Sequence, residues 1–226
     1  MNNVQIIELE NGMSLPIFRS ENLEEIIDIE NIKFIIDWLD TPPALNLQKR
    51  VGILMNPSEF VKLPNGFELT YVAAGTYSLI FRFRALNGQT VILKMQNKFQ
   101  NEIRANYIEE YKRITQLKSE LGEKLEEFGV RIPDYYMAGT SFSIREYIPG
   151  DILDSSSKGE EKSEAGLVIE TIKPIILPWL DQKRESGDTY WVDAKLDFND
   201  ILGRPSGKNF IRTPDGEIYL IDPFIG

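Results

Sequence analysis

LIFRFRALNGQTVILKM, from Leu79 to Met95, predicts two antiparallel strands joined by a tight turn. Apolar and basic residues alternate from Leu79 to Ala85, as in a strand with one buried face. Asn87-Gly88 is a strong signal for a two-residue hairpin turn. The second strand, Thr90 to Met95, is apolar except for Lys94, and a lysine there must contact an anion or lose hydration at a cost in free energy. The alternative is an edge strand whose lysine points to water.

The neighbouring sequence extends this hairpin into a mixed α and β pattern. Apolar residues at helical spacing predict helices over residues 24–39 and 100–128. We expect a further helix over residues 165–184, interrupted by Pro174 and Pro178 because proline removes a backbone donor. The strands expected besides those of the hairpin lie at residues 5–9, 67–73, 135–139 and 141–147.

The composition excludes several kinds of chemistry. The chain has 226 residues, a formal net charge of −10, no cysteine and no histidine. Disulfides, thiolate nucleophiles, imidazole bases and Cys or His metal sites are therefore absent from this sequence. The negative charge disfavours a nucleic-acid partner, and no apolar run approaches the roughly 18 residues of a membrane span. With no secretory signal at the N-terminus, we expect a cytoplasmic protein.

The segment GKNFIRTPDGEIYLIDPF, from Gly207 to Phe224, predicts a second hairpin with polar ends. Asn209 precedes the first strand of this hairpin. Asp222, which is thirteen residues after Asn209, follows the second strand. Oxygen-bearing side chains at the two ends of a tight hairpin can converge on one Mg²⁺ ion. The alternative is an ordinary hairpin with a solvated asparagine and a terminal aspartate.

The order of these elements resembles the protein-kinase-like superfamily over residues 66–224. Ile221-Asp222-Pro223 is similar to the terminal motif of the kinases found within polyvalent proteins, a compact bacterial or mobile-element branch. The resemblance implies an α+β fold with an antiparallel five-stranded N-lobe and one long helix, followed by a minimal C-lobe of a helix and the terminal β-hairpin. It divides the chain into an N-terminal extension (1–62), the N-lobe (63–150) and the C-lobe (151–226).

The same resemblance implies a site for ATP and Mg²⁺. Lys94 would orient the α- and β-phosphates and pair with a helix glutamate, for which Glu102 is the first choice and Glu109 the second. Asn209 and Asp222 would bind the metal ion. The other residues implied to contact the nucleotide are Gly75, Thr76, Tyr77 and Ser78 at the position of the Gly-rich loop, and Glu146 and Ile148 in the segment that joins the lobes. Since Gly75 alone remains of the usual glycines, a plain hairpin is the alternative for that loop.

The general base is the main departure from the family pattern. Arg204 stands five residues before Asn209, where related kinases place an aspartate. An insertion between Gly203 and Lys208 would bring Asp200 into the working position; otherwise the base is absent. The sequence also ends four residues after Asp222, so we do not expect a platform for a peptide substrate, and a protein partner or a homodimer would cover the shortened lobe.

These features leave more than one function open. The first is an ATP- and Mg²⁺-dependent phosphotransferase with an unidentified acceptor. The second is a catalytically inactive kinase-like module, or pseudokinase, that binds a nucleotide or a protein. The third is an unrelated α+β interaction protein whose terminal hairpin imitates the motif.

Overall fold

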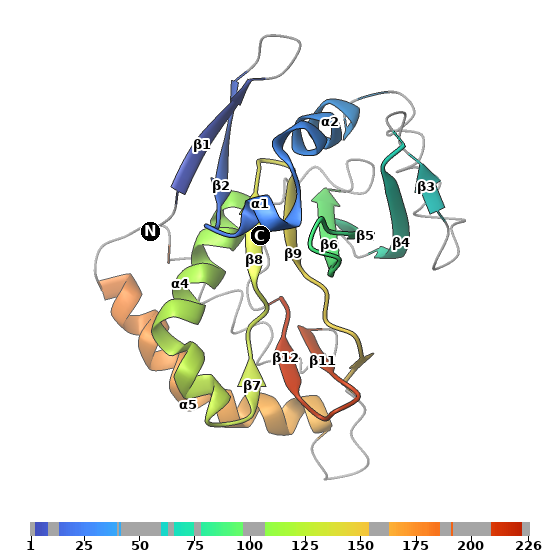
Figure 1. Ribbon diagram of the computed structural model, residues 1–226. Helices are drawn as coiled ribbons and strands as arrows, with labels where there is room; N and C mark the ends of the chain where they lie inside the picture. Colours follow the sequence, from blue (N-terminus) through green and yellow to red (C-terminus); the bar gives the residue numbers. More distant parts are fainter. Residues whose placement is uncertain are drawn as a thin grey trace. The chain divides into compact units, whose positions relative to one another are not determined.

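The computed structural model describes residues 3–8, 14–39, 41, 60–62, 66–74, 78–96, 107–153, 163–185, 191 and 209–222. These residues form an α+β protein with one large antiparallel sheet, which confirms the α+β part of the predicted fold class (Figure 1). They divide into two compact units. The first unit contains the described residues up to Tyr111 together with Asp134–Tyr147, and the second contains Lys112–Pro133 and the described residues from Ile148 onward.

The first unit is built on an eight-stranded sheet in which every neighbouring pair of strands is antiparallel. Its order is β1-β2-β8-β9-β6-β5-β4-β3. The strands are β1 (Asn3–Glu8), β2 (Ser14–Arg19), β3 (Phe60–Lys62), β4 (Glu68–Ala74), β5 (Ser78–Arg84), β6 (Thr90–Gln96), β8 (Tyr135–Ala138) and β9 (Phe142–Glu146).

The five central strands are the five that the sequence predicted between residues 67 and 147. β4, β5 and β6 form a meander, after which the chain enters helix α4 (Tyr107–Glu126) and returns through β8 and β9. β9 inserts between β8 and β6, so the third strand of the meander is a central strand with neighbours on both sides. The N-terminal residues, expected as a separate extension, add β1 and β2 to one edge of this sheet and β3 to the other.

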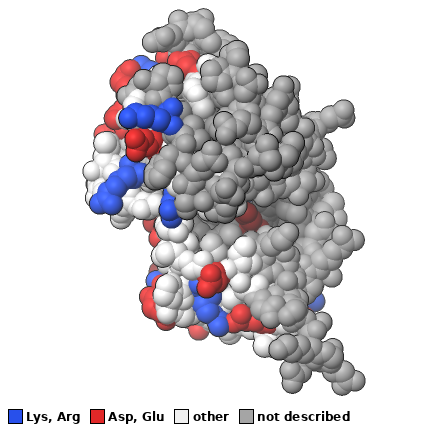
Figure 2. Space-filling model, turned by 90° about the vertical axis from the view of Figure 1, so that its right-hand side faces the viewer, with Lys and Arg blue, Asp and Glu red and all other residues white. Residues whose placement is uncertain are grey.

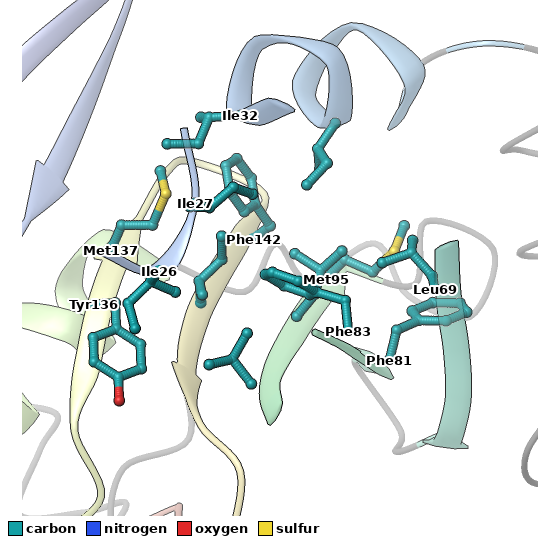
Figure 3. Packing of buried hydrophobic residues seen from close by; sticks show 14 of the residues in the cluster. Ile26, Ile27, Ile32, Leu69, Phe81, Phe83, Met95, Tyr136, Met137 and Phe142 are labelled. Atoms are coloured by element: carbon teal, nitrogen blue, oxygen red, sulfur yellow. The ribbon is translucent and has the colours of Figure 1, made fainter. Parts of the chain in front are cut away.

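The two faces of the sheet have different chemistry because side chains alternate along each strand. On β5, Leu79, Phe81 and Phe83 are buried in the hydrophobic core, while Ile80 and Arg82 point to the other face and are half-buried. The core also contains side chains of the helical segment 23–38, as Figure 3 shows. One face is therefore filled by hydrophobic packing, which leaves the opposite face for polar groups.

The helical segment that contributes to this core is broken, whereas the sequence predicted one helix over residues 24–39. Helix α1 (Leu23–Ile26) ends at Ile27, which has an extended backbone, and helix α2 (Ile29–Leu39) begins two residues later. Asp28 caps α2, because its Oδ1 accepts a hydrogen bond of 2.8 Å from the backbone N–H of Asn31. The break lets Ile27 enter the core beside Ile26 and Ile32.

The second unit contains a four-stranded sheet of order β10-β11-β12-β7. The terminal hairpin forms as predicted, from β11 and β12, and β12 also pairs in parallel with β7. The strands are β7 (Val130–Arg131), β10 (Asp151–Ile152), β11 (Phe210–Arg212) and β12 (Ile218–Leu220).

Helix α5 (Glu164–Glu185) is continuous through Pro174 and Pro178, so the predicted interruption is wrong. Both prolines are exposed, whereas the apolar side of the helix is buried at positions that include Ile172, Ile175 and Trp179. Each proline lacks a backbone N–H and so removes one hydrogen bond from the helix. The burial of the apolar side offsets the free energy lost with these two hydrogen bonds. Among the described helices, none is long and apolar enough to cross a membrane.

Candidate functional site

The polar face of the large sheet carries Lys94 near its centre. On β6, Lys94 lies opposite Ile80 of β5 and Ser143 of β9, so all three side chains share one face. Lys94 is only 9% exposed. A buried ammonium group needs polar or anionic contacts to offset the loss of its hydration, and the first turn of α4 supplies one.

Lys94 forms a buried ion pair with Glu110. The distance between Lys94 Nζ and Glu110 Oε1 is 3.1 Å, and the side chains are 11% and 2% exposed. The ammonium group also lies 5.9 Å from the centre of the Tyr107 ring, within the range of a cation–π contact. Because water screens this pair weakly, its attraction is stronger than that of a surface pair.

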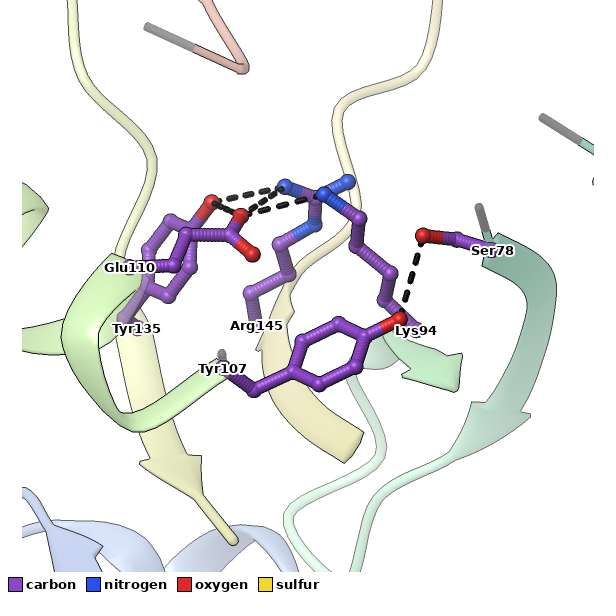
Figure 4. A network of polar contacts seen from close by, with 6 residues as sticks. All are labelled: Ser78, Lys94, Tyr107, Glu110, Tyr135 and Arg145. Atoms are coloured by element: carbon purple, nitrogen blue, oxygen red, sulfur yellow. Dashed lines mark hydrogen bonds and ion pairs between the residues drawn. The ribbon is translucent and has the colours of Figure 1, made fainter. Parts of the chain in front are cut away.

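Glu110 also contacts two residues of the neighbouring strands β8 and β9 (Figure 4). Tyr135 donates its hydroxyl hydrogen to Glu110 Oε1 over 3.2 Å. Arg145 donates to the Tyr135 hydroxyl over 2.6 Å, and its Nη1 lies 3.8 Å from Glu110 Oε1. The same carboxylate oxygen therefore accepts hydrogen bonds from Lys94 and Tyr135 and lies within ion-pair distance of Arg145, on the polar face of the sheet.

Tyr107 links the beginning of α4 to the beginning of β5. Its hydroxyl donates a hydrogen bond of 3.0 Å to Ser78 Oγ, and both side chains are buried. Burial raises the pKa of Tyr107 to about 12, although the charge of Lys94 and the bond to Ser78 act to lower it. Tyr107 therefore stays neutral at physiological pH and connects Ser78, a predicted nucleotide contact, to the surroundings of Lys94.

The two predicted metal ligands lie at the open end of the terminal hairpin. The backbone N–H of Ile221 donates a hydrogen bond of 2.8 Å to the carbonyl oxygen of Asn209, so Asp222 is one residue past the partner of Asn209. Hydrogen bonds between Thr213 and Glu217 close the turn at the other end: the N–H of Thr213 donates to the carbonyl oxygen of Glu217, and the N–H of Glu217 donates to Thr213 Oγ1. Gly216 in this turn has a φ of 91°. The hairpin register thus brings the backbones of Asn209 and Asp222 together.

No larger metal site is present in the part of the chain that the structure describes. There, no group of three or more Asp, Glu, His or Cys side chains is arranged to hold a metal ion. Two protein oxygens are enough for Mg²⁺ when phosphates and water complete its coordination.

The segment predicted to join the lobes, here called the hinge segment (residues 143–150), contains one of the points where the chain passes between the two units, between Tyr147 and Ile148. The N–H of Glu146 donates to the carbonyl oxygen of Asp134 over 2.8 Å, and the carboxylate of Glu146 accepts from the N–H of Asp134. Ile148 is buried.

Gly150, two residues after Ile148, has a φ of 151°, and a Cβ at this position would clash with the carbonyl oxygen of Arg212. Glycine is therefore needed where the hinge segment meets β11.

Several predicted site residues lie outside the described part of the chain: Gly75, Thr76, Tyr77, Glu102 and Asp200. Among the described residues, Glu110, the residue after Glu109, has the carboxylate that pairs with Lys94, whereas the sequence favoured Glu102 and then Glu109. A signal was present, because Tyr107, Glu110, Tyr111 and Ile114 follow the spacing of a buried helical stripe. A charged residue inside such a stripe indicates a buried ion pair.

The charges on the described surface are mixed. In the view of Figure 2, basic and acidic side chains lie next to one another on the described part of that face. Ion pairs between described residues include Arg19 with Glu24 and Lys33 with Glu30, both at 3.0 Å. Such exposed pairs contribute little to stability.

Comparisons with known proteins give only distant similarities. No protein family matches the chain, and no curated protein sequence matches it. The complex of Rv3197 with erythromycin, from Mycobacterium tuberculosis, is 17% identical with a TM-score of 0.33, and the match covers 87% of this chain and 56% of that one. The ternary complex of streptomycin, ATP and APH(2")-IIa is 15% identical with a TM-score of 0.29, and the match covers 83% and 72%.

Both of these proteins have the protein-kinase-like fold. This chain spans a little over half the length of the first of them, 56%. At these values neither structure identifies an activity for this chain.

Proposed function

We propose that this chain is a kinase-like phosphotransferase that binds ATP and Mg²⁺. The observation that supports this most is the buried ion pair of Lys94 and Glu110. It joins the third strand of a meander to the helix that follows it, and protein kinases use a strand lysine and a helix glutamate in this relation to hold the phosphates of ATP. An ion pair buried only for stability would gain little over apolar side chains of similar volume.

The proposed roles follow the chemistry of each residue. Lys94 contacts the α- and β-phosphates, and Glu110 keeps its ammonium group in place. Gly75, Thr76, Tyr77 and Ser78 cover the phosphates, and Tyr107 fixes the position of Ser78. Glu146 and Ile148 offer backbone groups to the adenine, although the N–H of Glu146 already donates to the carbonyl oxygen of Asp134.

Asn209 and Asp222 are the proposed ligands of Mg²⁺. When bound, this ion supplies positive charge that neutralises the phosphate oxygens. Asp200 is proposed to accept the proton of the acceptor hydroxyl. If Arg204 occupies that place instead, the chain is a nucleotide-binding pseudokinase, which is the second candidate function.

Thermal unfolding tests the nucleotide site. A ligand that binds only the folded state at a hundredfold excess over Kd adds about 2.7 kcal/mol of stability. We expect ATP with Mg²⁺ to raise the Tm of the wild type, and Asp222→Ala to remove the part of the shift that depends on Mg²⁺. Asp181→Ala, which changes a surface carboxylate of α5, is the control and should behave as the wild type.

Two results test the phosphotransferase and the pseudokinase. A Tm that ATP and Mg²⁺ leave unchanged in the wild type would overturn both the phosphotransferase and the nucleotide-binding pseudokinase. A shift without any conversion of ATP to ADP, in the presence of a broad set of hydroxyl acceptors, would favour the pseudokinase.

A further inference from the structure

The hydroxyl group of Tyr135 has a defined hydrogen-bond direction. Arg145 can only donate, because a guanidinium group has no acceptor. The Tyr135 oxygen must therefore accept from Arg145, over 2.6 Å. Its own hydrogen is then available for Glu110 Oε1, 3.2 Å away. The result is a directed chain of donors from Arg145 through Tyr135 to the carboxylate that contacts Lys94.

The side chains of Tyr135 and Arg145, which form this series of hydrogen bonds, are buried and packed against each other. Tyr135 and Arg145 lie opposite each other on β8 and β9, and each is 5% exposed. The guanidinium carbon of Arg145 lies 5.5 Å from the centre of the Tyr135 ring, so the two side chains also pack on each other. In a buried setting such hydrogen bonds polarise one another and are stronger than in water.

The contacts from Tyr135 and Arg145 restrict the rotation of the Glu110 carboxylate. Glu110 is on the first turn of α4, where Lys94 alone would leave the carboxylate free to rotate about its last side-chain bonds. The Tyr135 hydroxyl and the Arg145 guanidinium approach the same oxygen from the sheet and remove that freedom (Figure 4).

We propose that Tyr135 and Arg145 are positioning residues that hold Glu110 in the orientation in which it places Lys94 for the nucleotide phosphates. This inference rests on the proposed function. The two residues do not contact the nucleotide; they act through Glu110. The first turn of α4 is consequently fixed to the sheet before any ligand binds, and the lysine–glutamate pair needs no separate activation step.

A double-mutant cycle on nucleotide affinity tests this proposal. The Kd for ATP with Mg²⁺ is measured by calorimetry for the wild type, Tyr135→Phe, Glu110→Gln and the double variant. Tyr135→Phe removes one hydrogen bond to a charged group and should weaken binding about tenfold. In the Glu110→Gln background the same change should have less than about a twofold effect, because a residue that acts through another loses its effect when that residue is changed.

Three further variants separate positioning from general stability. Tyr136→Phe makes the same change on the next residue, whose side chain belongs to the hydrophobic core on the other face, and should leave the Kd unchanged (Figure 3). Arg145→Met should weaken binding as Tyr135→Phe does, and Arg145→Lys should restore part of the affinity because it keeps a charged donor.

The outcomes are distinct. A wild type that does not bind ATP overturns the proposed function and this inference with it. A wild type that binds ATP, with a Tyr135→Phe variant that binds equally well, overturns the inference alone. The same holds if Tyr135→Phe weakens binding equally in both backgrounds, since the effect then does not pass through Glu110.

Discussion

Neutralising Glu110 should be among the most destabilising single changes in the first unit. The Glu110 side chain is 2% exposed, and its carboxylate lies 3.1 Å from the Lys94 ammonium group and 3.8 Å from the Arg145 guanidinium group. Glu110→Gln keeps the shape of the side chain but removes the negative charge. Two buried cations then lose the carboxylate that they share.

The size of the effect follows from the burial of the pair. Removing one partner of a buried ion pair costs roughly 3 to 5 kcal/mol. The amide oxygen of glutamine can still accept a hydrogen bond, so we expect the lower end, about 3 kcal/mol. For a chain of this size that loss corresponds to a fall in Tm of roughly 6 to 12 °C.

Urea unfolding followed by circular dichroism measures this loss. Glu123→Gln, on the exposed side of the same helix, is the control and should stay within about 0.5 kcal/mol of the wild type. If Glu110→Gln also stayed within about 0.5 kcal/mol, the carboxylate would not be the buried counter-charge described here, and the reasoning about Lys94 would fail.

Three other changes test the surrounding structure. Gly150→Ala should cost at least about 2 kcal/mol, because alanine is strained at this φ and its Cβ meets the carbonyl oxygen of Arg212; urea unfolding measures it. Burial acts to raise the pKa of Glu120. The hydrogen bonds that the Glu120 carboxylate accepts from Lys183 and from other side chains outweigh the effect of burial, so the pKa lies below its ordinary value of 4.5. Glu120 therefore stabilises the fold above about pH 4.5 and progressively less as the pH falls further, so the stability gap between wild type and Glu120→Gln should narrow in acid. Asp28→Ala removes the cap of α2 and should cost about 1 kcal/mol by urea unfolding.

Each of these expectations has a contradicting result. Gly150→Ala with the stability of the wild type would mean that the backbone there is not held at its positive φ. A gap for Glu120→Gln that is constant between pH 7 and pH 3 would remove the ionised carboxylate from the account of that contact. An Asp28→Ala variant as stable as Asp28→Asn, a change that keeps a capping side chain, would show that the cap does not contribute.

The central sheet could be predicted because its signals are local. The alternation from Leu79 to Ala85, the Asn87-Gly88 turn and the single lysine in the next strand all lie within a few residues of the features that they determine. The terminal hairpin was predictable for the same reason, from its Pro214-Asp215-Gly216 turn between two apolar runs.

The errors arise where tertiary packing outweighs local preference. Pro174 and Pro178 normally interrupt a helix, but in α5 both rings point to solvent while the opposite side of the helix is anchored in the second unit. The break at Ile27 was missed because the apolar spacing on both sides of Asp28 fits one continuous helix, and an aspartate can stand inside a helix as well as cap one. The pairing of β2 with β8 joins residues more than a hundred positions apart, and no local pattern reports it.

Glu110 shows the same limit within the site. Its neighbour Glu109 is equally acidic, and the position of Glu110 on the buried side of α4 distinguishes the two. The helical spacing of Tyr107, Glu110 and Ile114 carries that information, because an acidic residue within an apolar stripe faces the protein interior.

The most direct test of the proposed nucleotide site is a calorimetric titration of ATP, with Mg²⁺, into the wild type, Lys94→Met and Lys62→Met. Lys62 is an exposed lysine of β3 and serves as the matched control. We predict equal Kd values for the wild type and Lys62→Met, and a Kd at least about tenfold higher for Lys94→Met, since a charge-assisted bond to phosphate is lost. Equal binding by the wild type and Lys94→Met, or no binding by the wild type, would contradict the role given to Lys94.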